Sequence, residues 1–134
     1  MRLVLDASVA VAAQRPQEPG YAASRARLIR VLTGADTVVV PSFFVVEVSG
    51  ALARLGFDRK TIGRLVDRLT APPHEVITVG PRGAKVARGA AIRAKLRGPD
   101  ALYVWLARRE GVPVCTLDRE ILTRGAALCQ VIAP

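Results

Sequence analysis

Cysteine, histidine and aromatic residues are scarce in this chain of 134 residues. The two cysteines, Cys115 and Cys129, are too few for a disulfide scaffold and lack the spacing of a metal site, so we expect reduced thiols in the core. A Ser–His–Asp triad or a zinc site would have to use the single histidine, His74, for which we expect a surface role after two prolines. Aromatic residues make up 4% of the chain, which argues against base stacking in the manner of an OB-fold.

Long apolar runs and cofactor motifs are also missing. The longest strongly apolar stretch, residues 37–46, is far below the roughly 20 residues of a transmembrane helix. The first 13 residues superficially resemble a secretion signal, but Asp6 is unfavourable there, so we expect mature structure and, by default, a cytoplasmic location. The chain has no G-x-G-x-x-G or Walker A pattern to bind a nucleotide cofactor. Without repeats, low-complexity tracts or linkers, its length predicts one domain over residues 1–134.

Acidic residues are outnumbered by basic ones, at 11 against 20, which gives a formal net charge of +9. Most of the basic residues are arginines, which form forked bonds to phosphate, so nucleic acid is a natural partner. An acidic protein segment would suit the same surface, and a compositional bias toward arginine would leave charges that only solvate helix faces. One run without any acid supplies candidate phosphate contacts, or alternatively a solvated helix face, at Arg82, Lys85, Arg88, Arg93, Lys95 and Arg97.

Short β-branched runs alternate with longer helical patterns along the chain. This alternation predicts an α/β fold with a parallel sheet covered on both faces. Within it, we expect Ser42 and Asp58 to cap the helices that follow them. The expected strands are residues 2–6, 37–40, 75–79, 112–117 and 129–132. The expected helices are residues 8–14, 21–32, 43–55, 59–69, 81–96, 99–111 and 119–126.

Four acidic residues lie in or next to apolar segments of the sequence. Asp6 and Asp118 each follow an apolar strand, at the end where open α/β sheets bind ligands, although each is also placed to cap the next helix. Glu47 lies in the apolar helical segment 43–48, or alternatively on an exposed polar stripe. Asp100 begins a helix, where the helix dipole also favours a carboxylate.

These four acids are able to converge at one edge of a parallel sheet, where their mutual repulsion would need a cation. Hard divalent cations take oxygen ligands, and Mg²⁺ combines one or two carboxylates with waters and substrate phosphates. A magnesium or manganese site that cleaves phosphodiesters with a metal-activated water fits both the acids and the basic exterior. The hydroxyl of Thr116 is placed to support this site beside Asp118.

At these residues the sequence resembles the PIN-domain ribonucleases and, within them, the VapC-like toxins of type II toxin–antitoxin modules. The resemblance covers nearly the whole chain, and the order and spacing of four motifs agree with it. The motifs are Leu3-Val4-Leu5-Asp6-Ala7-Ser8-Val9, the segment from Val40-Pro41-Ser42 through Glu47, Asp100-Ala101-Leu102 with Ala107, and Thr116-Leu117-Asp118. The loop over residues 14–24 has no obvious family signature, so the resemblance does not extend to substrate choice there.

The resemblance implies a PIN-like three-layer α/β/α sandwich with a central, mainly parallel sheet. It implies an Mg²⁺- or Mn²⁺-dependent endoribonuclease in which Ser8 and Thr116 support the metal site. It further implies a homodimer and an antitoxin whose tail occupies the groove. The carboxylates that would hold the metal are Asp6, Glu47, Asp100 and Asp118.

Two other functions are weighed against this hypothesis. One is a catalytically inactive PIN-like module that binds RNA or another protein, which the presence of all four acids argues against. The other is a phosphoacceptor domain of receiver type, which would need paired acids after the first strand and a late lysine, and neither is evident.

Overall fold

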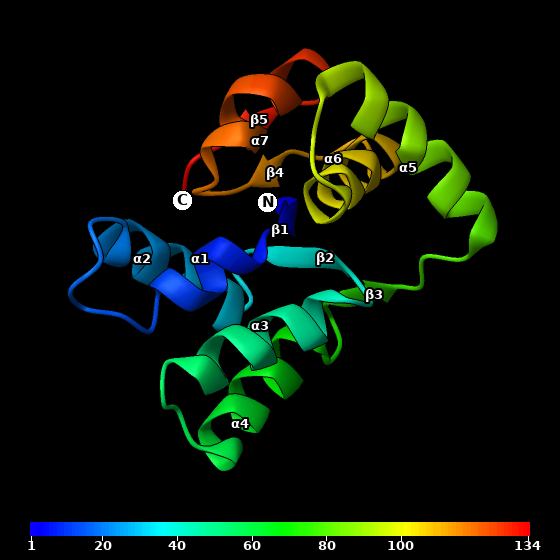
Figure 1. The fold of residues 1–134 in the computed structure, drawn as a ribbon. Helices are drawn as coiled ribbons and strands as arrows, with labels where there is room; N and C mark the ends of the chain where they lie inside the picture. Colours follow the sequence, from blue (N-terminus) through cyan, green and yellow to red (C-terminus); the bar gives the residue numbers. More distant parts are fainter.

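A computed structural model describes residues 1–134, and its centre is a five-stranded parallel sheet (Figure 1). The strand order is β3-β2-β1-β4-β5 and every neighbouring pair is parallel. All five predicted strands form, several of them shorter than expected. They are β1 (Arg2–Leu5), β2 (Thr37–Pro41), β3 (Glu75–Ile77), β4 (Val114–Cys115) and β5 (Val131–Ile132).

The helices lie on the two faces of the sheet and make the three-layer sandwich that the sequence predicts. In Figure 1, α1 to α4 lie to the left of or below strands β1 and β2, whereas α5 and α6 lie on their upper right. No helix combines the length and apolar character needed to cross a membrane. The helices are α1 (Ala7–Ala12), α2 (Tyr21–Leu32), α3 (Phe44–Arg54), α4 (Arg59–Thr70), α5 (Pro81–Ala94), α6 (Gly98–Glu110) and α7 (Arg119–Arg124), followed by the 3₁₀ helix η1 (Gly125–Ala127).

The two predicted caps have different outcomes. Asp58 caps α4 as expected, because its Oδ1 accepts a hydrogen bond from the Thr61 N–H at 2.9 Å. Ser42 is not a cap, because α3 has Phe43 at its N-cap position and no side-chain capping bond. Helix α3 begins at Phe44, one residue later than expected, and the Ser42 N–H donates to the carbonyl of Ile77, at 2.9 Å, which continues the pairing of β2 with β3.

A single cluster of 30 buried residues forms the core. In β1, Leu3, Val4 and Leu5 are fully buried, as expected for a parallel strand covered on both faces. Neither cysteine is paired. Cys115 is fully buried, and this burial raises the pKa of its thiol to about 11, while Cys129 is half-buried.

The expectation of a surface role for His74 is wrong. His74 is buried, and its Nδ1 accepts a hydrogen bond from the N–H of Val38 at 3.3 Å. Strand β3 begins at Glu75, opposite Val39, so the preceding N–H of β2 has no strand partner and the imidazole supplies an acceptor. Burial lowers the pKa of His74, which favours the neutral ring that this bond requires.

Candidate active site

The candidate site lies where the direction of the sheet connections reverses. Strands β1 and β4 are neighbours, but the chain leaves β1 toward β2 and leaves β4 toward β5, on the other side. Ligands of open α/β sheets bind outside the carboxyl ends of strands at such a switch point. Asp6 directly follows β1, and Asp118 follows β4 after two residues, so both stand at this point.

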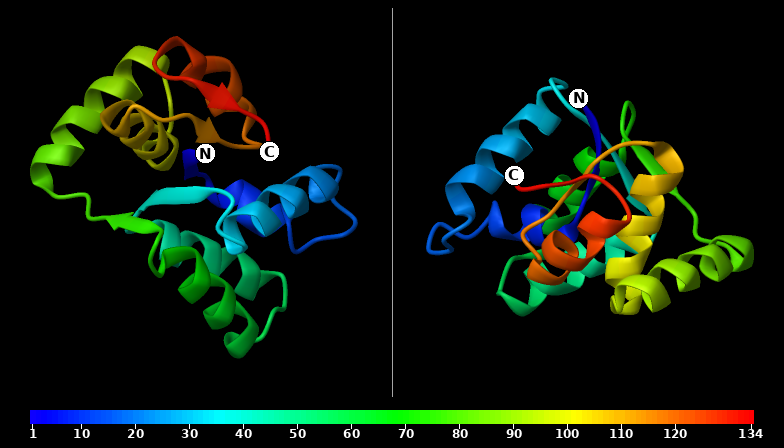
Figure 2. Two further views of the ribbon diagram at one scale, coloured as in Figure 1. Left: turned by 180° about the vertical axis from the view of Figure 1, so that it is seen from behind. Right: turned by 90° about the horizontal axis from the view of Figure 1, so that it is seen from above.

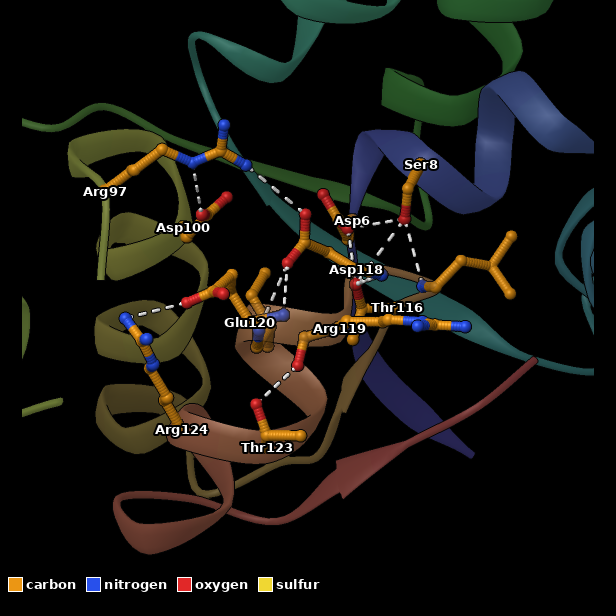
Figure 3. Close-up of polar contacts among 12 residues, drawn as sticks. Asp6, Ser8, Arg97, Asp100, Thr116, Asp118, Arg119, Glu120, Thr123 and Arg124 are labelled. Atoms are coloured by element: carbon orange, nitrogen blue, oxygen red, sulfur yellow. Dashed lines mark hydrogen bonds and ion pairs between the residues drawn. The ribbon is translucent and has the colours of Figure 1, made fainter. Parts of the chain in front are cut away.

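Two hydroxyls hold the carboxylate of Asp6. Ser8 Oγ and Thr116 Oγ1 each donate to Asp6 Oδ2 at 2.5 Å (Figure 3). Each hydroxyl also accepts a backbone N–H from the turn after β4, from Leu117 at 3.0 Å and from Asp118 at 2.9 Å. The carboxylate is therefore tied to the turn that carries the second aspartate. It makes no side-chain capping bond to α1.

Asp118 both caps a helix and faces the site, so the two interpretations of this residue are compatible. Its Oδ1 accepts hydrogen bonds from the N–H groups of Glu120, at 2.8 Å, and Ile121, at 3.2 Å, at the start of α7. Its other oxygen, Oδ2, lies 3.5 Å from Nη2 of Arg97. Capping leaves one oxygen of this carboxylate for other partners.

Arg97 bridges two of the acids. Its Nε lies 3.3 Å from Asp100 Oδ2, and its Nη2 reaches Asp118, so one guanidinium joins α6 to α7 (Figure 3). The Arg97 side chain is 74% exposed and stands at the N-cap position of α6. The sequence predicts Arg97 only as a phosphate contact, whereas in the structure it neutralises two carboxylates.

Glu47 enters the site from α3 and is held by a residue that none of the sequence motifs singled out. The hydroxyl of Tyr103 donates to Glu47 Oε2 at 2.6 Å and accepts the N–H of Ala7 at 3.3 Å. Tyr103 is fully buried and connects α6, α3 and the start of α1. The sequence contains an indication of this role, because Tyr103 follows Asp100 by three positions and residues three apart share a helix face.

Burial and mutual repulsion raise the pKa values of three of the acids. Desolvation is the main cause of the upward shift for Asp6, Glu47 and Asp100. Repulsion between carboxylates adds to the shift. Asp118 raises the pKa values of Asp6 and Asp100, and these two acids raise the pKa of Glu47. The four acids that the sequence singled out therefore form one electrostatic group, here called the acid cluster: Asp6, Glu47, Asp100 and Asp118.

The donor chemistry of the acid cluster fits a hard divalent cation, because all four side chains offer carboxylate oxygen. The side-chain positions do not enclose one as they stand, since no three acidic, histidine or cysteine side chains share a common point at coordinating distance. Arg97 supplies positive charge between two of the acids, and Tyr103 holds a third. A cation bound by Asp100 and Asp118 would therefore compete with Arg97.

The six basic residues of the run before Asp100 do not share one surface. Arg97 contacts the acid cluster. Arg82 and Arg93 line a groove between α5 and α6 instead, and Lys95 ends α5 in a left-handed conformation at φ 52°. Lys85 and Arg88 are exposed and line neither place.

Comparisons with known proteins agree with this fold. A family model described as "PIN domain" matches residues 3–127. No curated protein matches the chain. All of the chain superposes on 95% of a chain in the structure of FitAB bound to IR36 DNA fragment, with a TM-score of 0.68 and 21% identity. It is also similar, over 99% of its length and 98% of the other chain, to VapBC2 from Rickettsia felis bound to a DNA fragment from their promoter, with a TM-score of 0.63 and 14% identity.

Proposed function

Because this chain belongs to the PIN domain family, we propose that it is a metal-dependent endoribonuclease, the toxin of a VapC-like toxin–antitoxin pair. The observation that carries the proposal is the acid cluster, in which four segments distant in sequence bring carboxylates to the switch point of the sheet. Groups with pKa values raised by burial and like charge are typical of functional sites. We also take residues 1–134 to be one PIN-like domain.

In the proposed mechanism the acid cluster, Asp6, Glu47, Asp100 and Asp118, would hold Mg²⁺ or Mn²⁺. When bound, the cation supplies the positive charge that activates water and stabilises the leaving oxygen of the phosphodiester. Ser8 and Thr116 fix the orientation of Asp6 by donating to its Oδ2. Tyr103 does the same for Glu47. In this role the three hydroxyls hold the two carboxylates in place.

The partners in the proposal are an RNA substrate, an antitoxin protein and a second copy of the chain in a homodimer. The net charge of +9 supports a polyanionic substrate. The antitoxin is supported by the two similar structures, which are named as the complexes FitAB and VapBC2. A cytoplasmic location is part of the same proposal.

Cleavage of synthetic single-stranded RNA in Mg²⁺, Mn²⁺ or EDTA tests the proposal. We expect cleavage by the wild type with either cation, none in EDTA, and none by the Asp6→Asn or Asp100→Asn variants. Asp67→Asn is the matched control, since Asp67 is exposed on α4, far along the chain from the acid cluster. Full Mg²⁺-dependent cleavage by either site variant would refute the assignment.

One observation favours the second candidate, a catalytically inactive PIN-like module that binds RNA or a protein. Arg97 neutralises two acids, and the acid cluster does not close around one point. Titration with Mn²⁺ distinguishes the two functions. The nuclease should bind Mn²⁺ and lose that binding in Asp118→Asn, whereas an inactive module should bind none.

A further inference from the structure

A groove of about 640 Å³ lies between α5 and α6, away from the acid cluster. Figure 2 shows α5 at the margin of the molecule, against α6. Asp100 lies in the first turn of α6, whereas Arg108 of the groove lies in its last turn, about 12 Å farther along the helix axis. None of the four acids lines the groove. Its lining residues are Thr78, Gly80, Arg82, Gly83, Val86, Ala90, Arg93, Trp105, Arg108 and Arg109.

The floor and one wall of this groove are apolar. Trp105 lies at the floor with 8% of its surface exposed. Gly83 lets α5 approach the indole, because a Cβ at this position would lie 3.1 Å from the ring atom Cζ2. Val86 is 60% exposed on the wall, so an incoming apolar side chain would bury its surface as well as part of the indole.

The rim of the groove carries four guanidinium groups and no carboxylate. Arg82 and Arg93 come from α5, and Arg108 and Arg109 come from α6. All four are exposed, and of these only Arg109 has an ion pair, with Glu110 at 3.4 Å. The rim therefore presents positive charge that the chain does not neutralise.

We propose that this groove is the docking site of an acidic protein segment, which inserts one bulky apolar side chain between Val86 and Trp105 and sets carboxylates against the arginine rim. Guanidinium groups suit this role because each one can pair with a carboxylate through two parallel hydrogen bonds. RNA is the weaker fit, because a sugar–phosphate backbone has no apolar side chain to bury against Val86 and Trp105. The Arg109 guanidinium lies over the Trp105 ring, 5.7 Å from its centroid, so the inserted side chain would contact the part of the indole that this guanidinium leaves uncovered.

This inference does not rest on nuclease activity, because no groove residue belongs to the acid cluster. Loss of cleavage in Asp6→Asn would leave the docking site unaffected, and failure of docking would leave the nuclease proposal standing. The two ideas are therefore tested separately.

The assay uses Trp105, which is the only tryptophan of the chain and lies on the groove floor. The probe is a seven-residue synthetic peptide with glutamates on both sides of a central leucine, titrated into the intact protein while indole fluorescence is followed. We expect a saturable change in fluorescence. A peptide with alanine in place of the leucine should bind at least threefold more weakly, and one with lysines in place of the glutamates should not bind.

Charge reversals on the rim give the matched comparison. Arg82→Glu and Arg108→Glu should each weaken binding about fivefold or more, because each removes a pairing group and adds repulsion. Arg88→Glu makes the same change of charge on α5 but outside the groove, so it should have a smaller effect. All three positions are exposed, and unchanged thermal melting confirms that the variants fold.

Four results would overturn the proposal. The first is no saturable signal, and the second is equal weakening by the control reversal, which indicates non-specific attraction. The third is stronger binding of a single-stranded RNA of the same charge at this groove. The fourth is a concentration-dependent dimer that Val86→Glu abolishes, since a second copy would then occupy the groove.

Discussion

Replacing Asp6 by asparagine tests whether a buried negative charge opposes folding at the acid cluster. Asp6 is 4% exposed, and desolvation together with repulsion from Asp118 raises the pKa of its carboxyl. Removing the charge relieves a desolvation cost of several kcal/mol, and it loses the charge-assisted part of the bonds from Ser8 and Thr116, about 1 kcal/mol each. We expect the variant to be more stable than the wild type by about 1–3 kcal/mol near pH 8.

The pH dependence of this difference has a definite sign. Between the unfolded-state pKa of Asp6 and its raised folded-state pKa, the folded protein binds more protons than the unfolded chain. Stability of the wild type therefore falls as the pH rises through this interval, and the full penalty is present above it. The advantage of Asp6→Asn should be largest near pH 8 and should close as the pH falls toward the ordinary carboxyl pKa of 3.8.

Urea unfolding followed by circular dichroism in EDTA, at several pH values, measures the effect. Asp67→Asn is the control, because it removes the same charge from an exposed position of α4. Added Mg²⁺ should stabilise the wild type and not Asp6→Asn, since a ligand of the folded state alone stabilises it by mass action. A variant less stable than the wild type near pH 8, or a difference that grows as the pH falls, would refute the reasoning.

Three further predictions concern groups that hold the site and the fold. Arg97→Gln should bind Mn²⁺ about three- to tenfold more tightly by calorimetry, because the competing guanidinium is gone, and an unchanged affinity would contradict this. Tyr103→Phe removes the donor to Glu47 and should lower the free energy of unfolding by about 1–2 kcal/mol in urea, whereas unaltered stability would show that the bond contributes nothing. Asp36 is 1% exposed, and its bonds to Arg30 hold the pKa of this carboxyl well below its usual range. Asp36→Asn should therefore destabilise the protein at neutral pH, and the difference should begin to narrow only as the pH falls below the ordinary carboxyl pKa of 3.8, where the unfolded chain takes up a proton before the folded protein does; a gap independent of pH would oppose this.

Local patterns were sufficient to predict the elements of this fold. Apolar β-branched runs predicted all five strands, and the alternation with helices predicted that the sheet is parallel. The cap at Asp58 was readable because its partner, Thr61, lies three residues away. The prediction for Ser42 is wrong because α3 begins one residue later than expected, while the Ser42 N–H still pairs with Ile77 of another strand.

Contacts between distant residues limited the prediction of the site. The bond from Tyr103 to Glu47 spans 56 positions, and the bond from Thr116 to Asp6 spans 110. Local spacing places Tyr103 on the helix face of Asp100 and Thr116 beside Asp118, but it does not identify Glu47 and Asp6 as their partners. The same holds for His74, whose acceptor role depends on where β3 begins beside β2.

The sequence by itself determined which acids stand at strand ends and helix starts, because parallel strands place their carboxyl ends at one edge of the sheet. Only the tertiary structure decided what each acid contacts. Arg97 turns toward two carboxylates, one of which follows strand β4. Trp105 meets Gly83 beneath an arginine rim because α5 packs against α6. The spacing of apolar residues shows which face of a helix is buried, whereas only tertiary packing shows which residues of another element that face contacts.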